Sequence, residues 1–90
     1  MREFSRSSQF KKDVKRMERR GKNLAKLKRI LDLLIDGKLL PSEYKDHPLR
    51  GEFAGSRDCH LEPDWVLIYT LEENHVRFER TGTHSDLFNN

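Results

Sequence analysis

Apolar positions near the start of the chain recur at the spacing of a helix. Phe10, Val14 and Met17 fall at i, i+4 and i+7, so they form one stripe on a helix that we expect to end near Gly21. A serine at position 7 or 8 is suited to cap this helix, because its hydroxyl can accept a hydrogen bond from a free N–H of the first turn. The residues before it, 1–5, can form a short strand.

A second helix is predicted after Asn23, which is also a suitable N-cap. Its apolar positions at helical spacing are Leu24, Leu27, Ile30, Leu31, Leu34 and Ile35. Gly37 follows, and glycine tolerates the positive φ that is common just after a helix. Two helices joined around Gly21 predict an antiparallel hairpin, with the apolar stripes inward and the lysines and arginines outward.

After Pro41 the period changes from that of helices to that of strands. The segment "GEFAGSRDCHL" (51–61) predicts an irregular strand weakened by two glycines. "WVLIYTL" (65–71) is strongly β-prone, as expected for a central strand covered on both faces. "HVRFER" (75–80) alternates polar and apolar residues like a half-exposed strand, and "TGTHSDLF" (81–88) predicts a glycine turn and one helical turn.

This order, β-α-α-β-β-β, predicts a single α+β domain over residues 1–90. The N-terminal helical hairpin should pack on one face of a mostly antiparallel four-stranded sheet. The chain has no run of about 18 apolar residues that could span a membrane. Its first ten residues lack the apolar stretch of a signal peptide, and Cys59 is the only cysteine, so we expect a cytoplasmic protein.

Charge divides the chain into two parts, although the net charge is only +3. Residues 1–30 contain twelve Lys and Arg against three Asp and Glu, whereas residues 31–90 contain six against twelve. A basic N-terminal third favours binding to a polyanion, most simply a nucleic acid. The alternative is a pair of solvated helical faces with no such partner.

The four histidines and the cysteine raise the question of a metal site. A zinc site needs three or four ligands that converge, and the candidates are His47, Cys59, His60 and His84. Adjacent residues on a strand point to opposite faces, so Cys59 and His60 cannot share a metal without a bulge. The spacing therefore argues against a metal site. His75, at a turn, is expected to be structural.

Proton transfer fits the same stretch better. Asp58 and His60 are two apart on a strand and share a face, and Asp64 lies just across the following turn. Arg80 lies on the last strand and His84 follows it by four residues, so a sheet can bring these groups to one surface. Histidine serves as base or acid near neutral pH, and arginine stabilises charge on a phosphate. The set suits metal-free phosphodiester cleavage in which the 2′-OH of RNA is the nucleophile.

Three segments, "YKDHPLRGEF", "GSRDCHLEPDWVLIY" and "RFERTGTHSDLF", resemble the signature blocks of YafQ-type toxins in the RelE/ParE superfamily. The resemblance runs over nearly the whole chain and is most specific from Tyr44 to Phe88. It implies a toxin of a type II toxin–antitoxin pair that cleaves mRNA in the ribosomal A site and needs no metal or other cofactor. It also implies a DinJ-like antitoxin as partner, with operator DNA contacted only through the toxin–antitoxin complex.

The resemblance also implies roles for particular residues. The implied catalytic residues are His47, His60, Asp64 and His84. Of these, His47 and His84 would be acid and base in either order, while Asp64 and His60 would orient them or share their protons. The implied substrate-binding residues are Arg80 for the scissile phosphate, Phe88 for stacking on a base, and Trp65. The basic residues expected to contact ribosomal RNA are Lys11, Lys12, Lys15, Arg16, Arg19, Arg20, Lys26 and Arg29.

Two other functions are compatible with this order of elements. A ParE-like toxin of the same fold would poison DNA gyrase, but such proteins lack this set of histidines. A non-catalytic nucleic-acid-binding or repressor module would explain the basic helices and leave three histidines unused.

Overall fold

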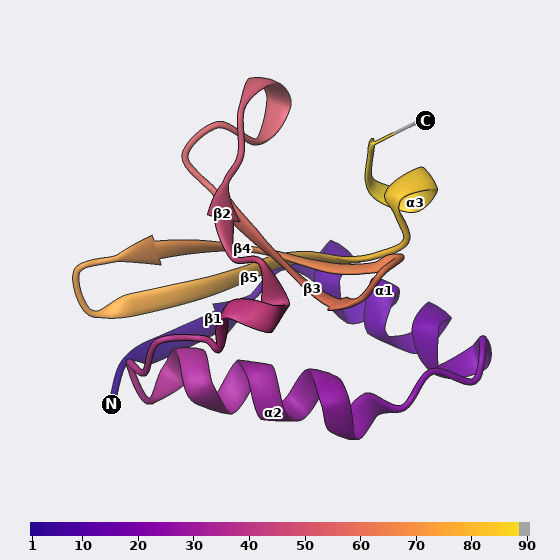
Figure 1. Ribbon diagram of the computed structural model, residues 1–90, viewed down its shortest axis with the longest axis horizontal. Helices are drawn as coiled ribbons and strands as arrows, with labels where there is room; N and C mark the ends of the chain where they lie inside the picture. Colours follow the sequence, from indigo (N-terminus) through magenta and orange to yellow (C-terminus); the bar gives the residue numbers. More distant parts are fainter. Residues whose placement is uncertain (89–90) are drawn as a thin grey trace.

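The computed structural model describes residues 1–88 and shows a five-stranded sheet with two helices packed on one face (Figure 1). The strands are β1 (Glu3–Arg6), β2 (His47–Pro48), β3 (Arg57–Glu62), β4 (Trp65–Glu72) and β5 (His75–Gly82). The helices are α1 (Ser8–Arg19), α2 (Leu24–Ile35) and α3 (His84–Phe88). The predicted α+β class is confirmed. The domain prediction extends to residues 89 and 90, which lie outside the described residues.

Local capping sets the ends of both long helices. Ser7 Oγ accepts a hydrogen bond from the N–H of Phe10 at 2.9 Å, and Asn23 caps α2 in the same manner. Gly21 and Gly37 follow the two helices with φ of 83° and 74°, and each N–H donates back to a carbonyl of the last turn. None of the helices within residues 1–88 has the length and apolarity needed to cross a membrane.

The sheet has the order β1-β5-β4-β3-β2, with β1 parallel to β5 and every other pair antiparallel. The prediction of four strands was wrong by one, because the two-residue β2 is too short to show an alternating pattern. The predicted strand over residues 51–61 was also too long. Gly51–Phe53 forms a 3-10 turn, and pairing with β4 begins only at Arg57, opposite Tyr69.

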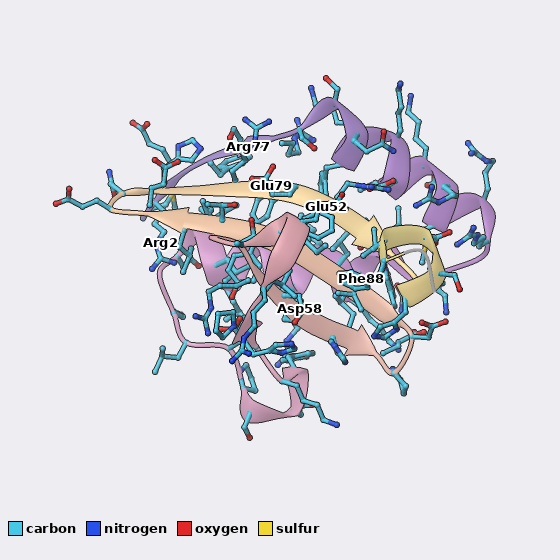
Figure 2. The ribbon with its side chains drawn as sticks, turned by 90° about the horizontal axis from the view of Figure 1, so that it is seen from above. Arg2, Glu52, Asp58, Arg77, Glu79 and Phe88 are labelled. Atoms are coloured by element: carbon cyan, nitrogen blue, oxygen red, sulfur yellow. The ribbon has the colours of Figure 1, made fainter. Side chains whose placement is uncertain are left out.

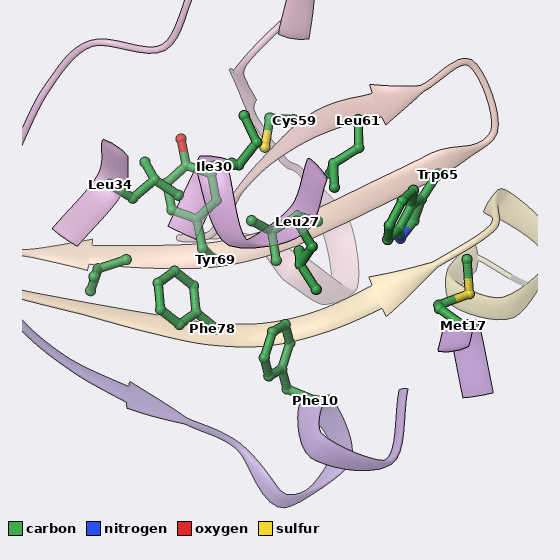
Figure 3. Packing of buried hydrophobic residues seen from close by; sticks show 12 residues of the cluster. Phe10, Met17, Leu27, Ile30, Leu34, Cys59, Leu61, Trp65, Tyr69 and Phe78 are labelled. Carbon is green, nitrogen blue, oxygen red and sulfur yellow. The ribbon is translucent and has the colours of Figure 1, made fainter. Parts of the chain in front are cut away.

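The main core lies between the helices and one face of the sheet (Figure 3). Its buried members are Phe10, Met17, Leu27, Ile30, Leu34, Cys59, Leu61, Trp65, Leu67, Tyr69, Val76 and Phe78. The assignment of Trp65 to substrate binding was wrong. Strand alternation turns Trp65 toward the helices with Leu67 and Tyr69, and it is fully buried, with its indole N–H donating to Thr81 Oγ1 at 2.9 Å.

The opposite face of the sheet has a second, smaller apolar cluster. Val66 and Ile68 are buried there under Leu87 of α3, with the partly buried Phe53 and Phe88 packed against them. Strand β4 is therefore covered on both faces, as "WVLIYTL" predicts. This second face is only partly covered, and it carries the candidate site.

Candidate active site

Three histidines from three separate elements lie in a row on the sheet face away from α1 and α2. His47 is on β2, His60 on β3, and His84 at the start of α3. The ring centroids of His47 and His60 are 6.0 Å apart, and those of His60 and His84 are 5.4 Å apart, with the rings edge to face. In Figure 2 the labelled Asp58 and Phe88 mark the same face, on β3 and α3. The structure thus brings together residues that are up to 37 positions apart in sequence.

Strand alternation explains which side chains of β3 reach this site. His47 pairs directly with Asp58 across β2 and β3, and His60 pairs with Val66 of β4. Cys59 points the other way and is fully buried in the main core, so it cannot join His60. No three His, Cys, Asp or Glu side chains among residues 1–88 are grouped so as to hold a metal ion.

Asp64 orients His84. One carboxylate oxygen of Asp64 lies 2.6 Å from His84 Nδ1 and accepts the backbone N–H of His84 at 2.9 Å. These contacts, the backbone one first, lower the pKa of Asp64, so the carboxylate stays charged and accepts the proton on Nδ1. The other ring nitrogen, Nε2, is then free to accept or deliver a proton, and the His84 side chain is 38% exposed.

His47 is held in a similar way by a carbonyl group. Its Nδ1 lies 2.7 Å from the carbonyl oxygen of Lys45 and 3.0 Å from Asp58 Oδ1. The carbonyl takes the hydrogen bond, because Asp58 Oδ1 is buried and has no hydrogen-bond partner among the described residues. Burial raises the pKa of Asp58, although the nearby imidazoles act in the opposite direction. His47 therefore also has Nε2 available to a substrate.

The loop before His47 is fastened to the centre of the sheet. Asp46 accepts a hydrogen bond from Arg57 Nε at 3.2 Å and another from the hydroxyl of Tyr69, whose ring is buried. Lys45 lies in the left-handed region with φ of 50°, which turns the chain sharply into β2. These contacts place His47 beside β3, a position that sequence spacing alone could not give.

His60 lies between the other two imidazoles. Burial lowers its pKa, with further lowering from His84 and His47, while Asp58 opposes the change. His60 is therefore neutral at neutral pH and presents one donor and one acceptor. It lines an open cavity of about 390 Å³, whose other lining residues include Tyr44, Lys45 and His84.

Arg80, on β5, lies on the same face of the sheet as the three histidines, opposite Ile68 of the second apolar cluster. Its Nε and Nη2 donate to the carboxylate of Asp13 at 2.7 and 3.3 Å, and its side chain is 24% exposed. Together with Arg50 and Phe88 it lines a second cavity of about 350 Å³. Asp13 fixes the guanidinium in place through Nε and Nη2, and Nη1 takes no part in this contact.

Sequence reasoning missed Asp13, although its position held a signal. It lies between Phe10 and Met17 on the apolar stripe of α1, and it is fully buried. A charged residue inside an apolar stripe must be paired, because an unpaired buried charge is costly. Among residues 1–88, its donors come from four residues: Gln9, Arg16, Arg80 and Thr81.

The C-terminal aromatic ring lies at the rim of the site. The Phe88 centroid is 6.0 Å from that of His84 and 5.8 Å from that of Phe53, which Phe88 meets edge to face. Phe53 was not identified from sequence. His75, in contrast, lies at the far end of β5 and contacts Ser5 Oγ at 2.8 Å.

The eight basic residues expected to bind ribosomal RNA fall into two groups. Those exposed without a partner among residues 1–88 are Lys11, Lys12, Lys15, Arg19 and Arg29. Arg16 and Arg20 pair with Asp86, and Lys26 pairs with Glu62. Sequence could not separate the groups, because Asp86 and Glu62 are distant in the chain and only the contact of Arg16 with Asp13 is local.

Comparison with known proteins gives consistent results over nearly the full length. The chain is 53% identical over 88 residues to the mRNA interferase toxin YafQ of Escherichia coli K12, covering 97% of this chain and 96% of that protein. The crystal structure of YafQ from E. coli BL21(DE3) superposes with a TM-score of 0.94 at 52% identity, covering 98% of this chain and 99% of that one. YafQ in the E. coli DinJ–YafQ complex gives 0.92 at 52% identity, with the same coverage.

A family model described as "Bacterial toxin of type II toxin-antitoxin system, YafQ" matches residues 2–89. The chain belongs to the YafQ family of bacterial type II toxin–antitoxin toxins.

Proposed function

We propose that the chain is an endoribonuclease that cleaves mRNA on the ribosome by acid–base catalysis with histidines. The row of His47, His60 and His84, with Asp64 holding His84, carries this proposal. The related E. coli toxin is named an mRNA interferase, which agrees with the chemistry of these side chains.

In the proposed reaction the scissile phosphate lies over His60, between the two outer imidazoles. One of His47 and His84 takes the proton of the 2′-OH, and the freed oxygen attacks the adjacent phosphorus. The bond from phosphorus to the 5′ oxygen breaks, and the other outer imidazole protonates that oxygen as it leaves. The products are a 2′,3′-cyclic phosphate and a 5′-OH end. His60, neutral because its pKa is lowered, can donate to a phosphate oxygen.

Arg80 and Phe88 are suited to hold the RNA around this point. The guanidinium of Arg80 is held in place by Asp13 and can stabilise negative charge on the phosphate with its free donors. Phe88 presents a partly exposed ring beside His84, where an unstacked base can pack on it. The exposed lysines and arginines of α1 and α2 provide contacts to ribosomal RNA phosphates.

The proposed partner is an antitoxin similar to DinJ, since the related E. coli protein forms a complex with DinJ. Contact with operator DNA would occur only through that complex. A protein that acts on translating ribosomes works in the cytoplasm, and we place it there.

The test uses ribosomes carrying a short mRNA in the A site, with or without a single 2′-deoxy nucleotide at the cleavage position. The RNA substrate should be cut to a 2′,3′-cyclic phosphate end, and the deoxy substrate should remain intact, because it lacks the nucleophile. Equal cleavage of both substrates would refute the mechanism. DNA damage in expressing cells without cut mRNA would favour the gyrase alternative.

A further inference from the structure

The position of His84 depends on a very short helix. Helix α3 has five residues, too few to be stable without external contacts. It carries both His84 and Phe88, so whatever holds α3 also sets where these two side chains lie. Leu87 attaches it to the sheet, but an apolar contact alone does not fix how the helix is rotated.

Asp86 ties α3 to the residue before it. Asp86 Oδ2 accepts the backbone N–H of Thr83 at 2.9 Å, and Thr83 Oγ1 accepts the backbone N–H of Asp86 at 3.2 Å. This reciprocal pair has the form of a capping box, with Thr83 at the N-cap and an acidic residue three positions later. It directs the turn that leads from β5 into His84.

The same carboxylate is clamped from α1. Arg20 Nη1 and Nη2 donate to the two oxygens of Asp86 at 2.6 and 3.2 Å, and Arg16 Nη2 lies 3.7 Å from Oδ2. The Asp86 side chain is only 15% exposed, whereas the Arg20 side chain that reaches it from the surface is 43% exposed. A two-point arginine–carboxylate contact fixes orientation as well as distance.

The backbone below this contact is shaped to allow it. A Cβ atom at Gly82 would lie 2.9 Å from Asp86 Oδ2 and 3.1 Å from Arg16 Nη2. Gly82, the last residue of β5, has no side chain and so leaves room for the Asp86 carboxylate to reach both arginines.

We infer that Asp86, clamped by Arg20, is a positioning residue that sets the place of His84 and Phe88. The catalytic part of this inference rests on the proposed function. The inference also gives Arg20 a role other than binding ribosomal RNA, because the charge of Arg20 is paired with Asp86 within the protein.

The two roles for Arg20 make opposite predictions for Asp86→Asn. If Arg20 holds Asp86, the variant should lose cleavage. If Arg20 binds ribosomal RNA instead, the variant should bind ribosomes more tightly and cleave at the wild-type rate. A positioning clamp fails whichever partner is lost, so Arg20→Ala and Asp86→Asn should both reduce single-turnover cleavage of saturating ribosome–mRNA complexes. The reduction should approach the roughly 10²-fold that a small misplacement of reacting groups can cost. The double variant should be no worse than either single variant, Arg20→Lys should recover part of the rate, and ribosome affinity should hardly change. Arg77→Ala, which removes an exposed arginine that pairs with Glu79 on β5 and has no part in the proposed site, is the matched control and should remain active.

A second measurement does not depend on activity. In ¹H–¹³C aromatic spectra of the free protein, Asp86→Asn should shift the signals of His84 and Phe88 and leave those of His75 in place. Unchanged signals, or an Asp86→Asn variant that binds ribosomes more tightly and cleaves at the wild-type rate, would overturn the inference. If the wild-type protein failed to cleave mRNA, the proposed function would fall, and the spectra would still decide whether Asp86 positions the helix.

Discussion

Replacing Asp13 by Asn tests whether the buried carboxylate of α1 holds the fold together as the geometry indicates. The substitution keeps the size of the side chain and removes its charge. It leaves Arg80, Arg16 and the backbone N–H of Thr81 facing an amide that can satisfy fewer of them. Arg80 is the most affected, since its Nε donates to Asp13 at 2.7 Å.

The expected loss of stability follows from burial. Breaking a buried ion pair by removing one partner costs about 3–5 kcal/mol, because the other charge is left uncompensated. Asp13 is fully buried, but the side chains of Arg80 and Arg16 are 24% and 29% exposed, so water compensates them in part. We therefore expect a loss near the lower limit, about 3 kcal/mol. For a domain of this size that lowers Tm by about 12–24 °C.

The assay is equilibrium urea unfolding of Asp13→Asn, followed by far-UV circular dichroism and tryptophan fluorescence. Asp32→Asn is the matched control: Asp32 is on α2 and pairs with Lys28 at 2.8 Å, but both side chains are largely exposed. An exposed pair contributes little, so this variant should unfold at nearly the same urea concentration as the wild type. A loss below about 1 kcal/mol for Asp13→Asn would refute the reasoning, because it would show that the network needs no charge at its centre.

The remaining predictions concern chemistry, pH and RNA. His47→Ala and His84→Ala should each reduce mRNA cleavage on the order of 10²- to 10⁴-fold, whereas His75→Ala should stay active; a fully active His84→Ala would remove the proposed pair. The pKa of His60 is lower in the folded protein than its ordinary value of 6.5 in the unfolded chain. The fold is therefore most stable above pH 6.5, where His60 is neutral in both states, and its stability falls as the pH drops from 6.5 through the folded pKa. Urea melts between pH 7 and 5 should show this loss, and it should be smaller in His60→Gln. Reversing three exposed charges should weaken ribosome pelleting and reduce its salt dependence, and unchanged cleavage would identify a merely solvated face. These three residues are Lys11, Lys15 and Arg19.

Elements specified by neighbouring residues could be predicted from sequence. The stripe from Phe10 to Met17, the caps at Ser7 and Asn23 and the β-prone run at 65–71 each depend on interactions within a few positions. Spacing placed His60 and His84 on one surface, the family resemblance added His47 as the partner of His84, and the structure brings the three together.

Features that depend on distant partners could not be predicted in this way. Trp65 was misassigned because packing on the helices decides which face of the sheet it occupies, and its neighbours in sequence do not specify that face. Strand β2 forms only by pairing with β3, where His47 lies opposite Asp58. Arg16 and Arg20 pair with Asp86 because the fold places α3 beside the end of α1. Asp13 and the Thr83–Asp86 cap did leave local signals: a charge within an apolar stripe, and an acidic residue three positions after a threonine.

The parallel pairing of β1 with β5 has a consequence for how the chain is made. Strand β1 pairs with a strand far along the chain: Ser5 contacts His75, 70 residues later. Pairs this distant in sequence form slowly, because closing so long a loop costs chain entropy. Until residues 75–78 have been synthesised, β1 has no strand to pair with, and α1 lacks the β5 surface on which it packs. His84 is added later still. The three histidines therefore come together only after β5 and the start of α3 have been synthesised.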